Sequence, residues 1–278
     1  MRKSRAYALA AIATLAVAAA AYAQQTTPQP AAAPAAEGEA PAASTTAALP
    51  DNAPVQAAAL DAVAELSKAH WGDAKAGATK AGVCAACHGV DGNPSDPQYP
   101  RLAGMPERYI ATQLALYKSG ERSTGMAVIM QPMAAPLSAQ DMRDVGAYFA
   151  QQKAGAGIAD DTAIADGPNK GMKFYQLGEQ LFRGGDPARG IPACMACHGP
   201  TGAGNPGPAY PHIGGQQSAY VQRRLEEYRT GTTNERDRRN FDVMATVAGK
   251  LSDEEITSLA SYVQGLHARS DEAAVATK

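Results

Sequence analysis

The feature that most constrains this chain is a five-residue motif that occurs twice. CAACH at residues 84–88 recurs as CMACH at residues 194–198, and the two motifs contain all four cysteines of the 278-residue chain. Cys-x-x-Cys-His is the attachment pattern of c-type haem, in which the thiols bond to the vinyl groups and the histidine ligates the iron. The motifs therefore predict two covalent haem c groups. The expected attachment residues are Cys84, Cys87, Cys194 and Cys197, with His88 and His198 as iron ligands.

Two other uses of such cysteines fit the chain less well. A redox dithiol does not require a histidine after its second cysteine. A zinc site would need a second pair of ligands in each half of the chain, or would have to pool cysteines from two distant segments. Haem attachment accounts for every residue of both motifs.

The motifs belong to a longer internal repeat. YPRLAGMPERYIATQLALYKSG (residues 99–120) recurs without a gap at residues 210–231, and MQPMAAPLSAQDMRDVGAYF (residues 130–149) recurs at residues 244–263. Self-similarity over this length indicates a tandem duplication of a unit of roughly 100 residues. We therefore expect two domains, one over residues 56–160 and one over residues 161–268.

Each repeat has the pattern of three helices and long loops. Expected helices cover residues 73–83, 106–117 and the segment after Ser138 in the first repeat, and residues 169–183, 218–228 and the segment after Ser252 in the second. Glycine ends each middle helix, and a carboxylate three residues after each serine indicates a capping box. Only 6% of the residues are aromatic, so three short helices cannot close a core unaided. The pattern predicts an all-α fold wrapped around one haem in each repeat.

A six-coordinate haem needs a second axial ligand opposite its histidine. Met244 is the only methionine after the second motif and lies eight residues before Ser252. Met130 lies eight residues before Ser138, so the repeat aligns the two methionines. We expect Met130 and Met244 as distal iron ligands, with Met133 as the alternative to Met130.

The loops after the motifs contain a repeated Tyr-Pro pair. A backbone carbonyl at Pro100 or Pro211 is placed to accept the Nδ1–H of the adjacent haem-ligating histidine, although a plain rigid turn is the simpler interpretation. Arg101 and His212 occupy matching positions, where they face either a haem propionate or solvent. His70 and His267 lie outside the repeated blocks and are expected at the surface.

The termini predict export and a flexible connection. Residues 1–23 have a basic start, an apolar run and the small-residue site Ala-Tyr-Ala, which is typical of a secretory signal peptide. A retained membrane anchor is the alternative, but the run is Ala-rich and shorter than the roughly 20 residues of a span. Residues 24–55 have the composition of a disordered Ala/Pro-rich tether, and residues 269–278 form a C-terminal tail.

The charge balance argues against nucleic acid as a partner. The chain has 25 basic and 27 acidic side chains, and loss of the signal peptide leaves 22 and 27, a net charge of −5. The one basic cluster is formed by Arg236, Arg238 and Arg239, on a loop expected to be solvated or to dock a partner.

These motifs together resemble the dihaem cytochrome c4 family. The likeness is carried by CAACHG and CMACHG, the two Tyr-Pro loops, the segments that lead from each methionine to the following serine, and LFRGG at residues 181–185. The resemblance implies two cytochrome c-like domains with His/Met-ligated haems, in a periplasmic electron carrier that is often associated with the membrane. It also implies redox partners in the membrane respiratory chain, with a terminal oxidase as acceptor and a quinol-oxidising complex as donor.

The expected function is respiratory electron transfer without a small-molecule substrate. Two His/Met-ligated haems leave no open iron position, which an enzyme would need. The alternatives are a dihaem peroxidase or sulfur-compound dehydrogenase, and the electron-transfer subunit of a dehydrogenase complex. No cysteine remains outside the two motifs to serve as the unusual ligand that such enzymes use.

Overall fold

The computed structural model describes residues 62–268. The predicted signal peptide (1–23), tether (24–55) and C-terminal tail (269–278) lie outside the described residues, as do residues 56–61. Helices and loops make up the described part, which has three isolated β-bridges and no strand. No helix among residues 62–268 is long and apolar enough to cross a membrane. The all-α prediction is confirmed.

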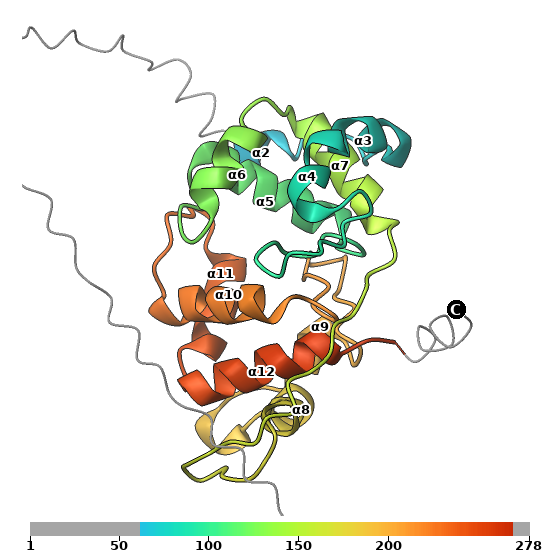
Figure 1. Ribbon diagram of the computed structural model, residues 1–278. Helices are drawn as coiled ribbons and strands as arrows, with labels where there is room; N and C mark the ends of the chain where they lie inside the picture. Colours follow the sequence, from blue (N-terminus) through green and yellow to red (C-terminus); the bar gives the residue numbers. More distant parts are fainter. Residues whose placement is uncertain (1–61, 269–278) are drawn as a thin grey trace, which may run out of the picture. The chain divides into compact units, whose positions relative to one another are not determined.

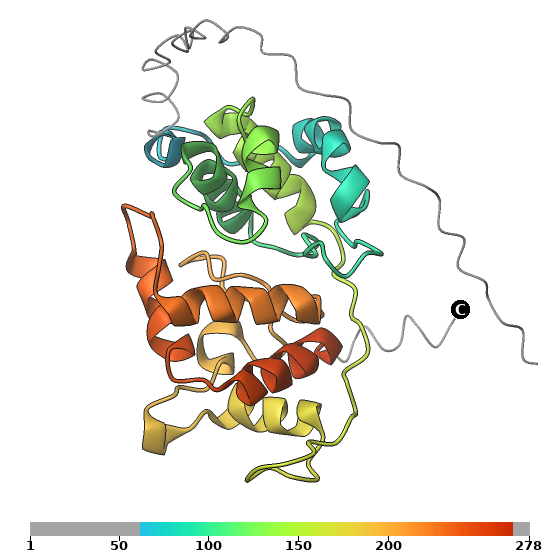
Figure 2. The same cartoon turned by 60° about the vertical axis from the view of Figure 1, so that its left-hand side comes forward.

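The described helices fall into two groups that follow the repeat (Figure 1). The first group comprises α2 (Ala62–Glu65), α3 (Ala74–Lys80), η1 (Ala81–Val83), α4 (Ala85–His88), α5 (Glu107–Ser119), α6 (Ala127–Ala134) and α7 (Ala139–Ala150). The second comprises α8 (Phe174–Gly184), η2 (Pro187–Arg189), α9 (Met195–His198), α10 (Ser218–Thr230), α11 (Arg239–Ala248) and α12 (Asp253–Gly265). Residues 151–173 connect the two groups (Figure 2).

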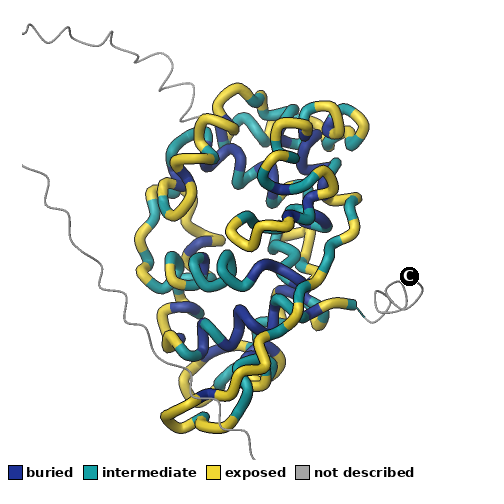
Figure 3. Tube along the Cα trace, viewed as in Figure 1, coloured by how far each residue is buried: buried dark blue, intermediate teal, exposed yellow. Residues whose placement is uncertain are grey.

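Each group of helices has its own hydrophobic core. Phe149 is completely buried in the first core, and Phe182 is completely buried in the second. Figure 3 shows buried segments in the helices of both groups. The two clusters draw their buried residues from different repeats, so each repeat packs around a centre of its own.

The helix signals in the sequence are present in the structure. Ser138 accepts a hydrogen bond from the backbone N–H of Asp141, whose carboxylate accepts one from the Ser138 backbone. Ser252 and Glu255 form the same capping box at the start of α12. The glycine after α5 is left-handed, with a φ of 75° at Gly120, so it ends the helix as expected.

The structure also contains helices that the sequence patterns did not predict. The segments around Met130 and Met244 form α6 and α11, although α6 contains Pro132. The predicted helix over residues 169–183 begins later, at Phe174. The preceding residues instead form a turn, in which the N–H of Gly171 donates to the carbonyl of Ile164.

Glycine allows the first and last helices of each repeat to cross closely. A Cβ on Gly77 of α3 would overlap the backbone carbonyl of Asp144 in α7, and a Cβ on Gly178 of α8 would overlap that of Ser258 in α12. The two crossings occupy equivalent places in the repeats. This contact brings the segment that leads into each haem motif against the last helix.

An ion-pair cluster strengthens the crossing in the first domain. The Lys80 Nζ lies 2.5 Å from an Asp141 oxygen and 2.6 Å from an Asp144 oxygen. Burial raises the pKa of Asp141, but hydrogen bonds from Lys80 and Ser138 outweigh it and bring that pKa down to about 2. The cluster therefore ties α3 to the N-terminal half of α7 while both carboxylates stay ionised.

The close crossing gives a first prediction. Gly178→Ala forces the backbones of α8 and α12 apart and is expected to lower the free energy of unfolding by about 1–3 kcal/mol. Gly184→Ala is the matched control, because a Cβ at the end of the same helix meets nothing within 4 Å. Thermal unfolding of the holoproteins measures both effects. Equal stability of the two variants would contradict the packing argument.

The ion-pair cluster gives a second prediction. The Asp141 pKa lies below its unfolded value of about 3.9, so the pair contributes fully above about pH 4, and its contribution disappears as the pH falls towards 2. Lys80→Met is expected to cost about 1–3 kcal/mol at neutral pH and to move acid unfolding to higher pH. Lys68→Met is the control, since the Lys68–Glu65 pair is solvent-exposed. Acid titrations followed by circular dichroism would show no difference between the variants if the cluster were unimportant.

Candidate haem sites

Each Cys-x-x-Cys-His motif forms a single helical turn. The backbone N–H of His88 donates to the Cys84 carbonyl at 2.9 Å, and the backbone N–H of His198 donates to the Cys194 carbonyl at 3.0 Å. Gly89 follows the first turn with a φ of 76°, which lets the chain leave the helix at once. The turn brings the two thiols and the imidazole to one place in each domain. All four thiols are free of disulfides.

A backbone carbonyl fixes the orientation of each histidine. The Nδ1 of His88 lies 2.9 Å from the Pro100 carbonyl oxygen, and that of His198 lies 3.1 Å from the Pro211 carbonyl oxygen. Because a carbonyl only accepts, each Nδ1 carries the proton, which leaves the Nε2 lone pair free for a metal. The hydrogen bonds expected from the Tyr-Pro loops are therefore present.

Both imidazoles are buried, with 6% of His88 and 7% of His198 exposed. Burial lowers the pKa of each histidine, against the opposing effect of its hydrogen bond to the proline carbonyl. The lowered pKa favours the neutral ring, which is the form that binds a metal. Burial and the carbonyl thus prepare the same tautomer in both domains.

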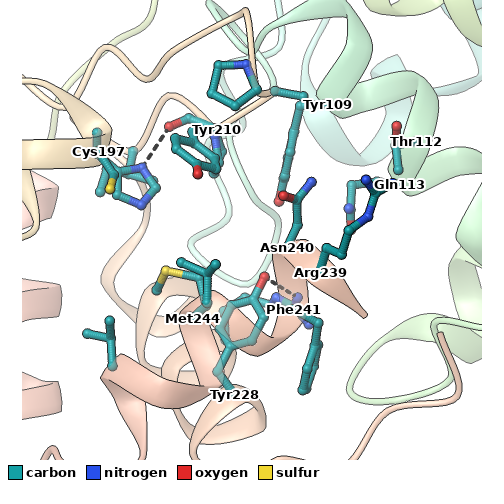
Figure 4. A pocket seen from close by; sticks show the side chains of 18 of the residues that line it. Tyr109, Thr112, Gln113, Cys197, Tyr210, Tyr228, Arg239, Asn240, Phe241 and Met244 are labelled. Carbon is teal, nitrogen blue, oxygen red and sulfur yellow. Dashed lines mark hydrogen bonds between the residues drawn. The ribbon is translucent and has the colours of Figure 1, made fainter. Parts of the chain in front are cut away.

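The predicted residues of the second site line one cavity of about 900 Å³. Cys194, Cys197, His198 and Met244 all contribute to its walls, together with apolar side chains such as Leu225. Figure 4 shows Met244 on a different wall of the cavity from Cys197. A large, mostly apolar cavity with two thiols, a neutral imidazole and a thioether fits a covalently bound haem.

The first site has the same residue types around the first core. Cys84 and Met130 pack against that core, and the ring of Tyr99 lies edge-on to His88 at 6.1 Å. Met130 is half-buried, whereas Met133 is 49% exposed. This difference in burial favours Met130 over Met133 as the inward-facing thioether.

Arg101 and His212 lie where the two domains meet. The Arg101 Nε donates to the Gly215 carbonyl at 2.8 Å, and its backbone N–H donates to the Gln216 side chain. The ring of His212 packs against Gly104 of the first domain so closely that a Cβ there would lie 2.9 Å from its Nδ1. The sequence predicts that these two side chains face either a haem propionate or solvent. The structure shows in addition that both contact the other domain. As expected, His70 and His267 are exposed.

The basic cluster is not a free patch. Arg236 pairs with Glu121 of the first domain at 2.9 Å, while Arg238 pairs with Asp242. Arg239 pairs with Asp237 and is the first residue of α11. The loop is solvated as expected, with 56% of the Arg236 side chain exposed, but each arginine of the cluster is paired with a carboxylate of the same chain.

Sequence reasoning gave no role to the tyrosines and arginines that surround the cavity. Tyr109, Tyr220, Tyr228 and Arg224 all line it, and Figure 4 shows Tyr109 and Tyr228 among its side chains. The signal was present in the repeat, because Tyr109 and Tyr220 occupy matching positions. That these two tyrosines line the same cavity follows only from the packing of the two domains against each other.

Comparison with known proteins identifies the fold. The Cytochrome c family model matches twice, over residues 74–153 and 175–267. Cytochrome c4 from Pseudomonas aeruginosa is 44% identical over 197 residues, covering 70% of this chain and 90% of that protein. This chain belongs to the dihaem cytochrome c4 family. Its two cytochrome c domains bind covalent haem c, and the four cysteines of the attachment motifs are in place.

A solved structure and a second relative are also similar to this chain. The crystal structure of reduced recombinant cytochrome c4 from Pseudomonas stutzeri matches with a TM-score of 0.61 and 43% identity, covering 70% of this chain and all of that chain. The thiosulfate dehydrogenase electron acceptor of Thiomonas intermedia is 34% identical over 210 residues, covering 73% of this chain and 88% of that protein. The predicted boundaries at residues 56–160 and 161–268 stay predictions, since the family matches are shorter.

We propose that Met130 and Met244 are the distal ligands, and the first of them gives a third prediction. Met130→Ala removes a thioether that stabilises ferrous iron, so we expect one lower reduction potential. The ferric protein is also expected to lose about half of its weak near-infrared Met-to-iron absorption band, because one of two such ligands is gone. Met133→Ala is the control and should leave both properties unchanged. The reverse outcome would mean that the repeat alignment slips by three residues in this segment.

Proposed function

We propose that this cytochrome c4 is a periplasmic carrier that takes electrons from a quinol-oxidising complex and delivers them to a terminal oxidase. The observation that carries the proposal is the duplicated set of buried histidine and half-buried methionine in a chain related to cytochrome c4. The signal-peptide pattern of residues 1–23 supports the periplasmic location. Because these partners are membrane complexes, the proposal includes peripheral association of the protein with the membrane.

The protein's own residues hold the proposed iron ligands in place and exclude water from the iron position. Bound haem supplies a one-electron Fe(III)/Fe(II) couple in each domain. The Pro100 and Pro211 carbonyls hold the imidazoles in one tautomer, so the ligands keep their orientation in both oxidation states. The apolar walls of the cavity keep water from the iron position. With Met130 and Met244 as ligands, no position is left for a substrate.

A second candidate donor is a sulfur-compound dehydrogenase. It is favoured by the relative from Thiomonas intermedia, whose name describes an electron acceptor of thiosulfate dehydrogenase. In this case the protein is still a carrier, and only the source of its electrons differs. A dihaem peroxidase or a dehydrogenase acting by itself fits less well, because both domains have a methionine at the matching position.

Surface charge gives little steering toward a partner. Residues 56–160 carry 9 basic and 10 acidic side chains, and residues 161–278 carry 13 and 14. The arginines of the basic cluster are each paired with a carboxylate of the same chain. Long-range attraction therefore contributes little to the association rate.

This balance gives a fourth prediction. Stopped-flow oxidation of the reduced protein by oxidase-containing membranes is expected to be fast and to slow only a few-fold between low and moderate salt. The isolated protein is expected to show negligible turnover of peroxide or thiosulfate. Turnover at ordinary enzyme rates, roughly 1–1,000 per second, would transfer the assignment to an enzyme. Oxidation only by a dehydrogenase complex would instead assign another partner.

A further inference from the structure

A Glu-Arg dipeptide occurs in the same place in both repeats. Glu121 lies nine residues before Met130, Glu235 lies nine residues before Met244, and an arginine follows each glutamate. Both dipeptides belong to the loop between the middle helix and the helix that contains the methionine. The duplication therefore places the same pair of opposite charges in each domain.

One carboxylate of this set forms an ion pair across the domain contact. Glu121 is buried and accepts hydrogen bonds from the Arg236 backbone N–H at 2.8 Å, from its Nε at 3.1 Å and from its Nη2 at 2.9 Å. Two residues before Arg236, the Asn234 side chain donates to the Ser123 hydroxyl at 2.9 Å. Charge-assisted bonds of this kind fix a position as well as compensate a charge. They tie the 231–238 loop of the second domain to the end of α5 in the first.

The remaining two members of the dipeptides also lie near each other. Burial raises the pKa of Glu235, and the guanidinium charges of Arg224 and Arg122 oppose this effect. Arg122 is buried and belongs to the first domain, where it donates to the Gln113 side chain. Each domain thus supplies one carboxylate and one guanidinium, and each carboxylate is near a guanidinium of the other domain. Reciprocal contacts of this form are typical of two copies that meet about a two-fold axis.

These four residues form a Glu-Arg clasp in the wall of the second haem cavity. Glu121, Glu235 and Arg236 all line the cavity that contains His198 and Met244. Glu121 is a residue of the first domain, so the cavity of the second domain is completed by its neighbour. The clasp is therefore placed to control how well that cavity is closed.

The Glu121–Arg236 pair is unequally exposed, and this decides what its loss would do. The Arg236 side chain is 56% exposed, whereas that of Glu121 is 6% exposed. Removal of Arg236 leaves a buried carboxylate without its counter-charge, and such a group draws in water. Removal of the Glu121 charge leaves a solvated guanidinium and frees the 231–238 loop. Either change therefore opens the cavity wall to water.

We propose that Glu121 and Arg236 are positioning residues through which the first domain closes the second haem site. They act through the 231–238 loop and not through their own charges, which cancel while they are paired. Solvent access to a haem sets its dielectric surroundings and its potential, and water favours the more highly charged ferric state. The domain contact thus has a part in holding the potential of one haem.

Redox titration of the isolated holoprotein tests this role with Arg236→Gln and Glu121→Gln. Arg236→Gln is expected to shift one haem's redox equilibrium about tenfold toward ferric iron, or about 59 mV for one electron. Glu121→Gln is expected to shift it in the same direction by about threefold, because the exposed guanidinium that remains is screened by water. Charges that acted directly would give shifts of opposite sign, since one variant removes a positive and the other a negative charge. Opposite shifts would overturn the proposal.

Imidazole binding to the ferric holoproteins measures access to the iron without a redox step. Imidazole must enter the cavity to replace an iron ligand, and its apparent affinity follows the fraction of molecules with an open wall. Both glutamine variants are expected to bind imidazole at one haem about tenfold more tightly than the unmodified protein. Arg236→Lys keeps the charge and one donor, so it should recover most of the original affinity. Unchanged potential and imidazole affinity in folded Arg236→Gln would reject the clasp.

Two controls separate the clasp from general effects of charge. The double variant Glu121→Gln/Arg236→Gln is expected to change the potential and the affinity no more than Arg236→Gln alone, because both changes break one interaction. Additive effects would show that the two residues act independently and would contradict the proposal. Arg183→Gln removes an equal charge from an exposed pair on α8, and a change of less than twofold is expected.

Glu121→Gln keeps the shape of the side chain, so it decides the test if Arg236→Gln does not mature. The inference rests on haem binding and not on the identity of the redox partner, since neither measurement needs one. Failure of the membrane oxidation assay would therefore leave it standing, and its own failure would leave the carrier function intact.

Discussion

The hydrogen bond from the histidine of each attachment motif to a proline carbonyl organises much of this protein. It joins the helical turn of the attachment motif to the loop that precedes the middle helix, at 2.9 Å in the first domain. The residue after Pro100 is Arg101, which bonds to the Gly215 carbonyl and to Gln216 of the second domain. One short loop thus orients the proposed iron ligand His88 and makes the domain contact. A shift of this loop would disturb the histidine and the interface together.

The two repeats have different residues at several positions where they meet. Arg101 of the first repeat corresponds to His212, Met105 to Gln216, and Gln113 to Arg224. A duplicated domain that packs against its own copy cannot satisfy an interface with identical residues on both sides unless the two sides are related by symmetry. Here each side has acquired a different donor or acceptor. The reciprocal bonds between the Arg101 backbone and the Gln216 side chain, at 2.8 and 3.0 Å, are an example.

Local chemistry explains which parts of the fold are predictable from sequence. The Ser138 and Ser252 capping boxes and the glycine after α5 act within a few residues, and all are found where expected. The helix around Met130 was not predicted, because Pro132 normally argues against a helix interior. In this case the proline lies near the end of a short helix, so only a few backbone bonds are affected. Short helices of this kind depend on tertiary packing.

In the candidate sites, too, local sequence features can be predicted and long-range contacts cannot. The attachment cysteines are close in sequence and follow from the motif alone, whereas the proposal of Met130 and Met244 rests on the repeat. The ion pair between Arg236 and Glu121 joins residues 115 positions apart, and no sequence pattern connects them. In the sequence, Arg236 is a candidate for binding a partner, whereas the structure pairs its guanidinium with the carboxylate of Glu121. Long-range pairs of this type decide the surface character of the protein, and they require the three-dimensional arrangement.

The segment that connects the domains is bound to both of them. The Gly155 N–H donates to the Asn93 side chain of the first domain at 2.7 Å, and the Gly157 N–H donates to the Gln264 carbonyl of the second at 2.9 Å. A Cβ on Gly215 would overlap the Gly155 carbonyl, so only glycine permits this approach. A connection held on both sides does not behave as a free hinge. Because backbone contacts rather than exposed ion pairs anchor it, salt should weaken this attachment little.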